Sequence, residues 1–446
     1  MKVSNYTFLF MHNNEHYAYN SLSNSLIELD TESYLFLHNA RNAKNVNLGS
    51  LNEDAQKTLI DNRFVTENDE DDFLMYKSAI HNLRRQYNSM HLTIAPTMEC
   101  CFNCPYCFEK TKGGEAMSET VMDSIINFVL AQSKPLEALN LTWFGGEPLM
   151  AIDRMEVFYV KLKQRLSEKI QYSSNIITSG YHLDKYALAI LKNLHVSSIQ
   201  VTIDGLKETH NKIKYLSSCE DVFSKVINNI DYATRHEKDI HVTIRVNLTL
   251  ANAEEYPILY KWLVDRFGQR SNISIAPAFV LDRSAMTTGS VKSSTLFTHK
   301  ERSKYILELA NKNLDSPFLH FPKPFFSECA IRNANAISFD PEGYAYKCWE
   351  KIGDKDYAVW KLSPEGHLEN INTKLLNRLM YGADPIDDHI CSKCRYLPIC
   401  GGGCPLQRME NNFEGKNNTL CTFYKGFLPE FLGIHIERKK LNIFNY

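Results

Sequence analysis

The chain has 446 residues, of which 44% are hydrophobic and 23% are charged, and its formal net charge is -2 at pH 7. This length exceeds what one hydrophobic core serves, so we expect a soluble protein of two or three domains. The balanced charge argues against nucleic acid or a membrane surface as a partner. No apolar run is long enough to span a bilayer and no signal peptide is apparent, which together indicate a reducing, cytoplasmic location.

Residues 1–72 are predicted to form a small α+β module, in which short strand patterns precede helical ones. The strand patterns cover residues 6–11, 16–20 and 26–29, and the helical patterns cover residues 31–39 and 51–61. The acidic stretch 66–72 is interpreted as a solvated linker that closes the module. Residues 73–90 then predict a connecting helix.

Strand and helix patterns alternate over residues 91–280. The strand patterns cover residues 91–96, 140–144, 175–179, 198–204, 241–247 and 272–276, and the helical patterns cover residues 118–132, 152–170, 183–194, 222–236 and 253–267. This repeat predicts an α/β fold, a partial (β/α)6 TIM-type barrel with its site at the carboxyl ends of the strands. Residues 281–328 are expected to connect the barrel to a cysteine-rich region.

The twelve cysteines are concentrated in two segments, and only Cys219 stands alone. In a reducing compartment such clusters indicate metal binding rather than disulfides. The first segment, Cys100-x3-Cys104-x2-Cys107, directly follows the first predicted strand of the repeat. Three thiolates can hold three irons of a [4Fe–4S] cube and leave the fourth iron open to a ligand. The alternatives are a zinc site, which normally needs four ligands, or an electron-transfer cluster.

This loop resembles the one that defines the radical S-adenosylmethionine (SAM) superfamily. The resemblance implies that Cys100, Cys104 and Cys107 bind the cluster, and that the amino and carboxylate groups of SAM chelate its open iron. It places Tyr106 near the adenine, whereas Cys101 falls at a position that does not bind the cluster.

Further resemblances lie at the ends of the next three predicted strands. The motif Gly145-Gly146-Glu147-Pro148 is similar to the one that meets the methionine ammonium of SAM in this family. Ser179 belongs to the segment Ile177-Thr178-Ser179-Gly180, which lies where the family often has Thr-Thr-Asn-Gly. Thr202 and Lys214 stand where a Ser and an Arg bind the ribose and the methionine carboxylate. Lysine keeps the charge of that arginine but lacks its bidentate fork.

Arg245 and Asn247 lie on the fifth predicted strand. They are interpreted either as polar residues that face the cofactor cleft or as part of a solvated strand face, and the sequence does not decide between them.

Seven cysteines in the last third resemble the SPASM domain, here residues 329–421, with a C-terminal tail at 422–446. The resemblance implies two auxiliary [4Fe–4S] clusters, one held by Cys391, Cys394, Cys400 and Cys421 and the other by Cys329, Cys348 and Cys404. Zinc knuckles are the alternative. Two closed cubes need eight ligands, so the second cluster is expected to have an open iron unless water, Glu328 or Cys219 completes it.

The sequence therefore predicts an enzyme that forms a 5′-deoxyadenosyl radical and abstracts hydrogen from a peptide or protein. The expected product is a thioether or other crosslink, or an oxidised residue, in a ribosomally made peptide. A low-potential donor such as flavodoxin or ferredoxin is expected to supply electrons.

Two other functions and two roles of the N-terminal module remain open. One alternative is a sulfatase-type formylglycine maturase, for which Glu350 is a weak catalytic candidate because it lies one residue out of register. The other is a non-catalytic, cluster-bearing peptide-binding protein. The module at residues 1–72 either recognises the peptide or caps the barrel.

Overall fold

The computed structural model describes residues 1–68, 71–109, 112–132, 135–281, 295–314, 321–324 and 329–441. The chain forms two compact units. The first unit comprises Met1–Arg85, His299–Arg332 and Arg378–Tyr446, and the second comprises Gln86–Thr298 and Asn333–Asn377. No helix in the described residues is both long and apolar enough to cross a membrane.

The second unit is built on one ten-stranded sheet, of which six strands form the predicted parallel repeat. These strands pair in chain order, from the sixth back to the first. They are β6 (Ser89–Ile94), β7 (Ala138–Trp143), β8 (Gln171–Thr178), β9 (Val196–Ile203), β10 (His241–Leu248) and β11 (Ile273–Phe279). The predicted α/β fold is therefore confirmed.

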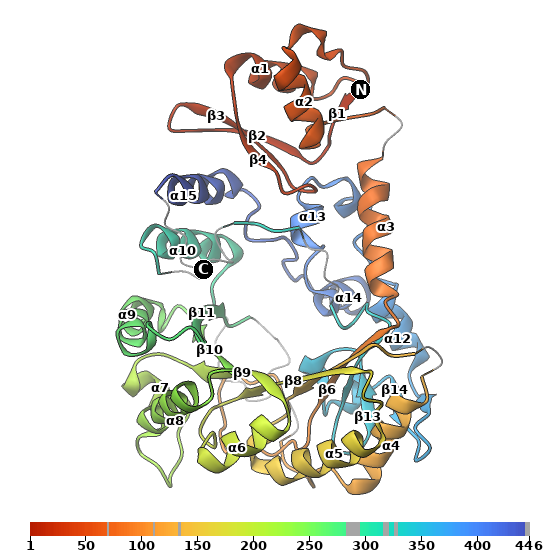
Figure 1. Cartoon of the computed structure of the whole chain (residues 1–446), viewed down its shortest axis with the longest axis vertical. Coiled ribbons are helices and arrows are strands. Elements are labelled where there is room, and N and C mark those ends of the chain that lie inside the picture. Colours follow the sequence, from red (N-terminus) through yellow and green to blue (C-terminus); the bar gives the residue numbers. More distant parts are fainter. Residues whose placement is uncertain are drawn as a thin grey trace. The chain divides into compact units, whose positions relative to one another are not determined.

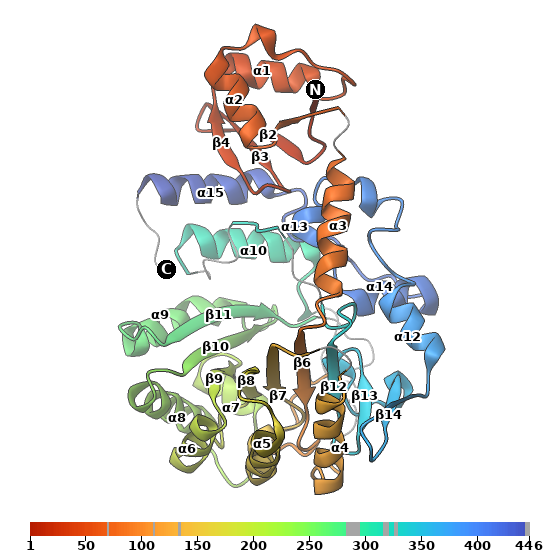
Figure 2. The same ribbon diagram turned by 45° about the vertical axis from the view of Figure 1, so that its right-hand side comes forward.

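Helices follow these strands and cover the outer face of the sheet (Figures 1 and 2). The five predicted helices are present as α4 (Glu119–Leu130), α5 (Ile152–Arg165), α6 (Lys185–Asn193), α8 (Val222–His236) and α9 (Tyr256–Phe267). A sixth helix, α7 (Lys207–Ile213), was not predicted because it is too short to show a helical period.

The alternation of residues along each strand separates the helix-covered face from the interior. In β10, Val242, Ile244 and Val246 are buried, whereas Arg245 and Asn247 occupy alternate positions and are only partly buried. Successive side chains of a strand point to opposite faces, so aliphatic residues meet the helices and polar residues face the inside of the curved sheet.

The sheet also continues beyond the predicted barrel. Strand β12 (Ala336–Phe339) pairs in parallel with β6 on the side away from β7. Three antiparallel strands follow it: β13 (Tyr344–Tyr346), β14 (Trp360–Leu362) and β15 (Leu368–Asn370). Part of the cysteine-rich region, including Cys348, is thus joined to the barrel sheet.

The first unit contains the predicted N-terminal module. Its antiparallel sheet consists of β2 (Thr7–His12), β3 (Glu15–Asn20) and β4 (Leu26–Leu29), followed by α1 (Thr31–Ala40) and α2 (Glu53–Asp61). A pair formed by β1 (Lys2–Val3) and β5 (Val65–Thr66) was not predicted, since two residues carry no recognisable period.

Two predictions for this region were wrong. Residues 66–72 are not simply a solvated linker, because Thr66 lies in β5 and Asp72 is buried, accepting a 2.6 Å hydrogen bond from Ser4 Oγ and pairing with Arg63. Helix α3 (Asp72–Arg84) ends six residues before the predicted boundary at residue 90, because the chain must extend to enter β6.

The rest of the cysteine-rich region contains the helices α12 (Thr373–Met380), α13 (Leu397–Cys400) and α14 (Pro405–Glu414). Helix α15 (Leu428–Lys440) lies in the C-terminal tail, and α10 (His299–Asn311) lies in the predicted connection. Within the first unit, the N-terminal module packs against this region. Ser21 Oγ donates to the carbonyl of Arg395 over 2.6 Å, and the Phe8 and Tyr396 rings meet edge to face.

Candidate active site

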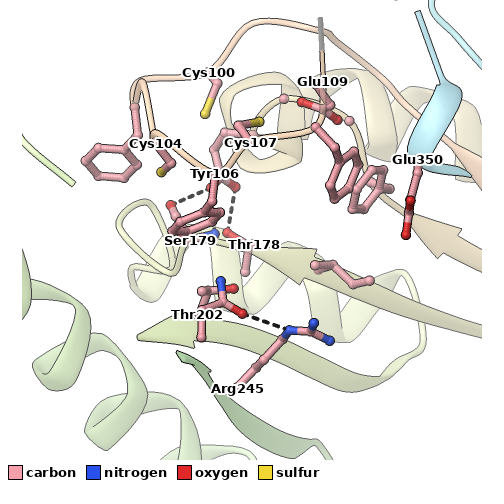
Figure 3. Close-up of a pocket in the computed structure, with 18 of the residues that line it drawn as sticks. Cys100, Cys104, Tyr106, Cys107, Glu109, Thr178, Ser179, Thr202, Arg245 and Glu350 are labelled. Carbon is pink, nitrogen blue, oxygen red and sulfur yellow. Dashed lines mark hydrogen bonds between the residues drawn. The ribbon is translucent and has the colours of Figure 1, made fainter. Parts of the chain in front are cut away.

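One cavity in the second unit gathers most of the residues that the sequence singled out (Figure 3). Its walls come from the loop after β6, the carboxyl ends of β7 to β11 and the turn after β13. The predicted site residues that line it are Cys100, Cys104, Tyr106, Cys107, Gly145, Gly146, Glu147, Ser179, Thr202, Lys214, Arg245, Asn247 and Glu350. The site therefore lies where a barrel of parallel strands is expected to carry it.

The three thiols of the cysteine loop are soft donors in a sparsely solvated environment. Burial raises the pKa of Cys107 to about 12 and also raises the pKa of Cys104. The adjacent Cys101 thiol, together with burial, raises the pKa of Cys100. A bound iron deprotonates the thiols that coordinate it, so this donor set suits an iron–sulfur cluster.

Gly145 and Gly146 allow the cysteine loop to pack directly on the end of β7. A Cβ at Gly145 would lie 2.4 Å from the carbonyl oxygen of Thr97, and one at Gly146 would lie 2.1 Å from that of Glu99. The amide of Gly146 donates to the Thr97 carbonyl over 3.2 Å, and the amide of Glu147 donates to the Glu99 carbonyl over 2.7 Å. The two glycines thus fix the start of the cysteine loop, a role that the sequence analysis missed.

Glu147 joins the ends of β7 and β8. Its carboxylate is buried and accepts hydrogen bonds from Thr178 Oγ1 at 2.6 Å, from the Ser179 amide at 2.8 Å and from Ser179 Oγ at 2.5 Å. Hydrogen bonds of this kind to a carboxylate are strong and directional. Glu147 and Ser179, which the resemblance placed at one cofactor, are therefore neighbours.

A buried charged cluster ties the cysteine loop to the end of β9. The Tyr106 hydroxyl donates to Asp204 Oδ1 over 2.5 Å, and Lys214 Nζ forms an ion pair with Asp204 Oδ2 and contacts the Tyr106 hydroxyl at 3.1 Å. Burial opposes the ionisation of Asp204, but Lys214 and His210 outweigh it and hold the pKa of Asp204 below its usual range. Asp204 lies two residues after Thr202, but the sequence did not indicate a role for it.

Arg245 and Asn247 face the cavity, which settles the alternative that the sequence left open. Arg245 Nε donates to Asn247 Oδ1 over 3.1 Å, and Arg245 pairs in register with Thr202 of β9. Burial lowers the pKa of the Arg245 guanidinium, whereas Tyr106 and Glu350 raise it electrostatically.

Aromatic rings form an apolar wall beside the cysteine loop. The rings of Phe108 and Phe144 stack at a centroid distance of 6.1 Å, and Trp349 lies 5.0 Å from Phe144. Glu350 follows Trp349, and the buried Glu109 follows Phe108. Burial raises the pKa of Glu109 to about 7, although Lys112 opposes this shift. Glu109 was not predicted as a site residue, because its only signal in the sequence is its position two residues after Cys107.

Six of the seven predicted auxiliary-cluster ligands belong to the first unit: Cys329, Cys391, Cys394, Cys400, Cys404 and Cys421. Cations approach two of their thiols, since Arg408 Nη1 lies 3.4 Å from Cys391 Sγ and Lys425 Nζ lies 3.4 Å from Cys421 Sγ.

The assignment of these cysteines to two clusters stays a prediction. Cys348 belongs to the second unit, and Glu328 lies outside the described residues. In the described part of the chain, no three Cys, His, Asp or Glu side chains gather closely enough to ligate a single metal ion. The thiolates of a cubane bind separate irons and need not converge in that way.

Residues 94–263 match the family model described as the Radical SAM superfamily. The Fe-coproporphyrin III synthase of Methanosarcina barkeri is 20% identical over 337 residues, which cover 69% of this chain and 80% of that protein. The cysteine-type anaerobic sulfatase-maturating enzyme of Clostridium novyi is 21% identical over 368 residues, or 77% of this chain and 95% of the relative. Among solved structures, native anSMEcpe with bound AdoMet and Kp18Cys peptide matches with a TM-score of 0.59 and 18% identity, covering 78% and 98% of the two chains.

Proposed function

Because residues 94–263 match the Radical SAM superfamily, we propose that this chain is a radical SAM enzyme that abstracts a hydrogen atom from a peptide or protein substrate. The observation that carries the proposal is the single cavity that brings Cys100, Cys104 and Cys107 together with the polar ends of β7 to β10. When bound there, a [4Fe–4S] cluster and SAM would supply a 5′-deoxyadenosyl radical, and the protein would position and shield it.

The proposed roles of the polar residues follow from their positions in the cavity. The three cysteines would hold the cluster, and Glu147, fixed by Thr178 and Ser179, would accept a hydrogen bond from the methionine ammonium. Thr202 would bind the ribose through its hydroxyl, and Tyr106, fixed by Asp204, would lie beside the adenine. The stacked rings of the aromatic wall would exclude water from the reacting atoms.

A peptide substrate is supported by the comparisons. The structural relative was solved with a peptide bound, and the curated relative from Clostridium novyi matures sulfatases. That relative is matched over nearly its whole length, but it covers only 77% of this chain. The additional sequence favours a substrate other than a sulfatase, and we propose a crosslink or an oxidised residue in a ribosomally made peptide.

Formylglycine formation is the second candidate, and Glu350 favours it. This carboxylate lines the cavity beside the aromatic wall, where it could accept the proton that an oxidised side chain loses. In either reaction the auxiliary clusters would take up the surplus electron, and a flavodoxin or ferredoxin would supply the reducing electron.

The proposal is tested by replacing Cys100, Cys104 and Cys107 together with Ala. We expect the reconstituted variant to lose about four irons per chain and all 5′-deoxyadenosine formation from SAM and dithionite, because one cubane has lost its ligands. The matched control is Cys101→Ala in the same loop, which should keep both. If the triple variant still forms 5′-deoxyadenosine at the wild-type rate, the proposed site is wrong.

A further inference from the structure

Lys214, which stands at the family's carboxylate-binding position, already forms an ion pair within the protein. Lys214 is only 2% exposed and is held by Asp204, which is completely buried. Its ammonium also contacts the Tyr106 hydroxyl. Moving Lys214 to a ligand would leave Asp204 as a buried charge without its ion pair, which is strongly unfavourable. Lys214 is therefore a poor candidate for binding the carboxylate of SAM.

Arg245, in contrast, has a guanidinium group that is available to bind a carboxylate. The only hydrogen bond of its guanidinium within the described residues runs from Nε to Asn247 Oδ1. Both terminal amino groups of the guanidinium therefore stay available, and together they form the planar fork that binds a carboxylate through two parallel hydrogen bonds. No described carboxylate forms an ion pair with the guanidinium, although Glu350 acts on it electrostatically from another wall of the cavity, and the side chain is only partly exposed. Such a cation gains from an anionic ligand.

The position of Arg245 is also suitable. It lines the same cavity as the three cysteines and pairs in register with Thr202, at the position that the family uses for the ribose. Figure 3 shows Thr202 and Arg245 on neighbouring strands below the cysteine loop, with the guanidinium extending into the cavity. The hydrogen bond from Arg245 Nε to Asn247 limits the rotation of the guanidinium.

We propose that Arg245 is the cation that binds the methionine carboxylate of SAM in this protein, in place of Lys214. Lys214 has instead become a positioning residue that holds Asp204 and, through it, Tyr106 of the cysteine loop. This inference rests on the proposed function, since it assumes that SAM enters the cavity. It adds a residue that the sequence resemblance did not assign to the cofactor.

The test compares SAM with decarboxylated SAM, which lacks only the carboxylate. Dissociation constants of both compounds are measured by equilibrium dialysis on reconstituted wild type and Arg245→Gln. We expect the substitution to weaken SAM binding about tenfold or more, as for a hydrogen-bonded charge pair, and to weaken binding of decarboxylated SAM less than about twofold. Because SAM also chelates iron through its carboxylate, the diagnostic quantity is the ratio of the two changes.

Arg245→Lys provides the second variant, and it should recover only part of the SAM affinity because an ammonium lacks the fork. Iron content per chain and thermal melting verify that both variants are folded and loaded. Equal weakening of both compounds, or unchanged SAM affinity in Arg245→Gln, would overturn the proposal, and the latter result would reassign Arg245 to a carboxylate of the substrate. Failure of the wild type to bind SAM at all would instead contradict the proposed function.

Discussion

Asp204 and Lys214 form a buried pair whose two members depend on each other. Asp204 accepts from both Tyr106 and Lys214, and its own amide donates to His210 Nδ1 over 3.2 Å. Removing one partner of such a pair leaves an uncompensated charge in a medium that solvates it poorly. The pair should therefore contribute to the stability of the cysteine loop as well as to its position.

We expect Asp204→Asn to lower the free energy of unfolding by about 3–5 kcal/mol, because the Lys214 ammonium would stay buried without a counter-ion. Chemical denaturation of the full-length protein, followed by tryptophan fluorescence, measures the change. The control is the double variant Asp204→Asn/Lys214→Met, which removes both charges and should recover much of the loss. A single variant as stable as the wild type would show that the pair is not buried in the way described.

Individual site residues were predictable when their role is local, and less so when it depends on a distant partner. The cysteine spacing and the Gly-Gly-Glu-Pro motif are readable because each motif lies within one loop. Asp204 was assigned no role because its partner Tyr106 is 98 residues away in the sequence. Lys214 matched a position in the family, but only the structure reveals its ion pair with Asp204.

At the scale of elements, the end of β7 and the cysteine loop are in direct backbone contact at Gly146. A methyl group on this residue would lie 2.1 Å from the Glu99 carbonyl oxygen and 2.6 Å from that of Met98. Neither neighbour is a flexible side chain that could move aside. The fit between strand and loop therefore sets the position of Cys100, the first residue after Glu99.

Gly146→Ala should displace the cysteine loop, lower iron incorporation by up to one cubane per chain and destabilise the fold by about 1–3 kcal/mol, as overpacking does. Iron per chain and the 5′-deoxyadenosine rate measure the effect. Gly113→Ala is the matched control, because a Cβ there meets nothing within 4 Å and the cost is confined to its positive φ of 97°. Full iron loading of Gly146→Ala would mean that the loop is free to move away from β7.

The long elements of the barrel were predictable, and the short ones were not. Six strands and five helices show their periods over seven or more residues in most cases, so the sequence predicts them at nearly the right places. Strands β13 to β15 have three residues each, which is too few to show an alternating pattern. The parallel pairing of β12 with β6 joins segments more than 240 residues apart and leaves no local signal.

At the scale of the whole molecule, the predicted segments do not coincide with the compact units. The sequence divides the chain where motifs and charge change, whereas compactness follows packing between distant segments. Residues 333–377 join the barrel sheet, and the N-terminal module shares the first unit with most of the cysteine-rich region. The small cluster of Tyr6, Leu22, Tyr76, Ile386 and Leu397 illustrates this, since its members come from both ends of the chain.

The N-terminal module is therefore expected to support the cysteine-rich region, whether or not it also recognises a peptide. Cys391 packs against the apolar cluster that contains Tyr6 and Leu22 of the module. Truncating a buried leucine costs about 2–5 kcal/mol, because it leaves a cavity that the surroundings fill only in part. Leu22→Ala should therefore loosen the segment that carries Cys391 and Cys394, the proposed ligands of one auxiliary cluster.

We expect Leu22→Ala, and more strongly the deletion of residues 1–68, to lower iron by up to one cubane per chain, while the cluster of the barrel and uncoupled 5′-deoxyadenosine formation persist. Iron analysis and electron paramagnetic resonance of the reduced protein measure the two kinds of cluster separately. Leu35→Ala is the matched control, because this side chain is 50% exposed on α1 and should not affect iron content.

If the deleted protein keeps all its iron and loses only affinity for its peptide, the module serves recognition alone. If it loses iron in the way described, weakened peptide binding by the same protein cannot be taken as evidence for a recognition module, and exposed residues of the module must be varied one at a time.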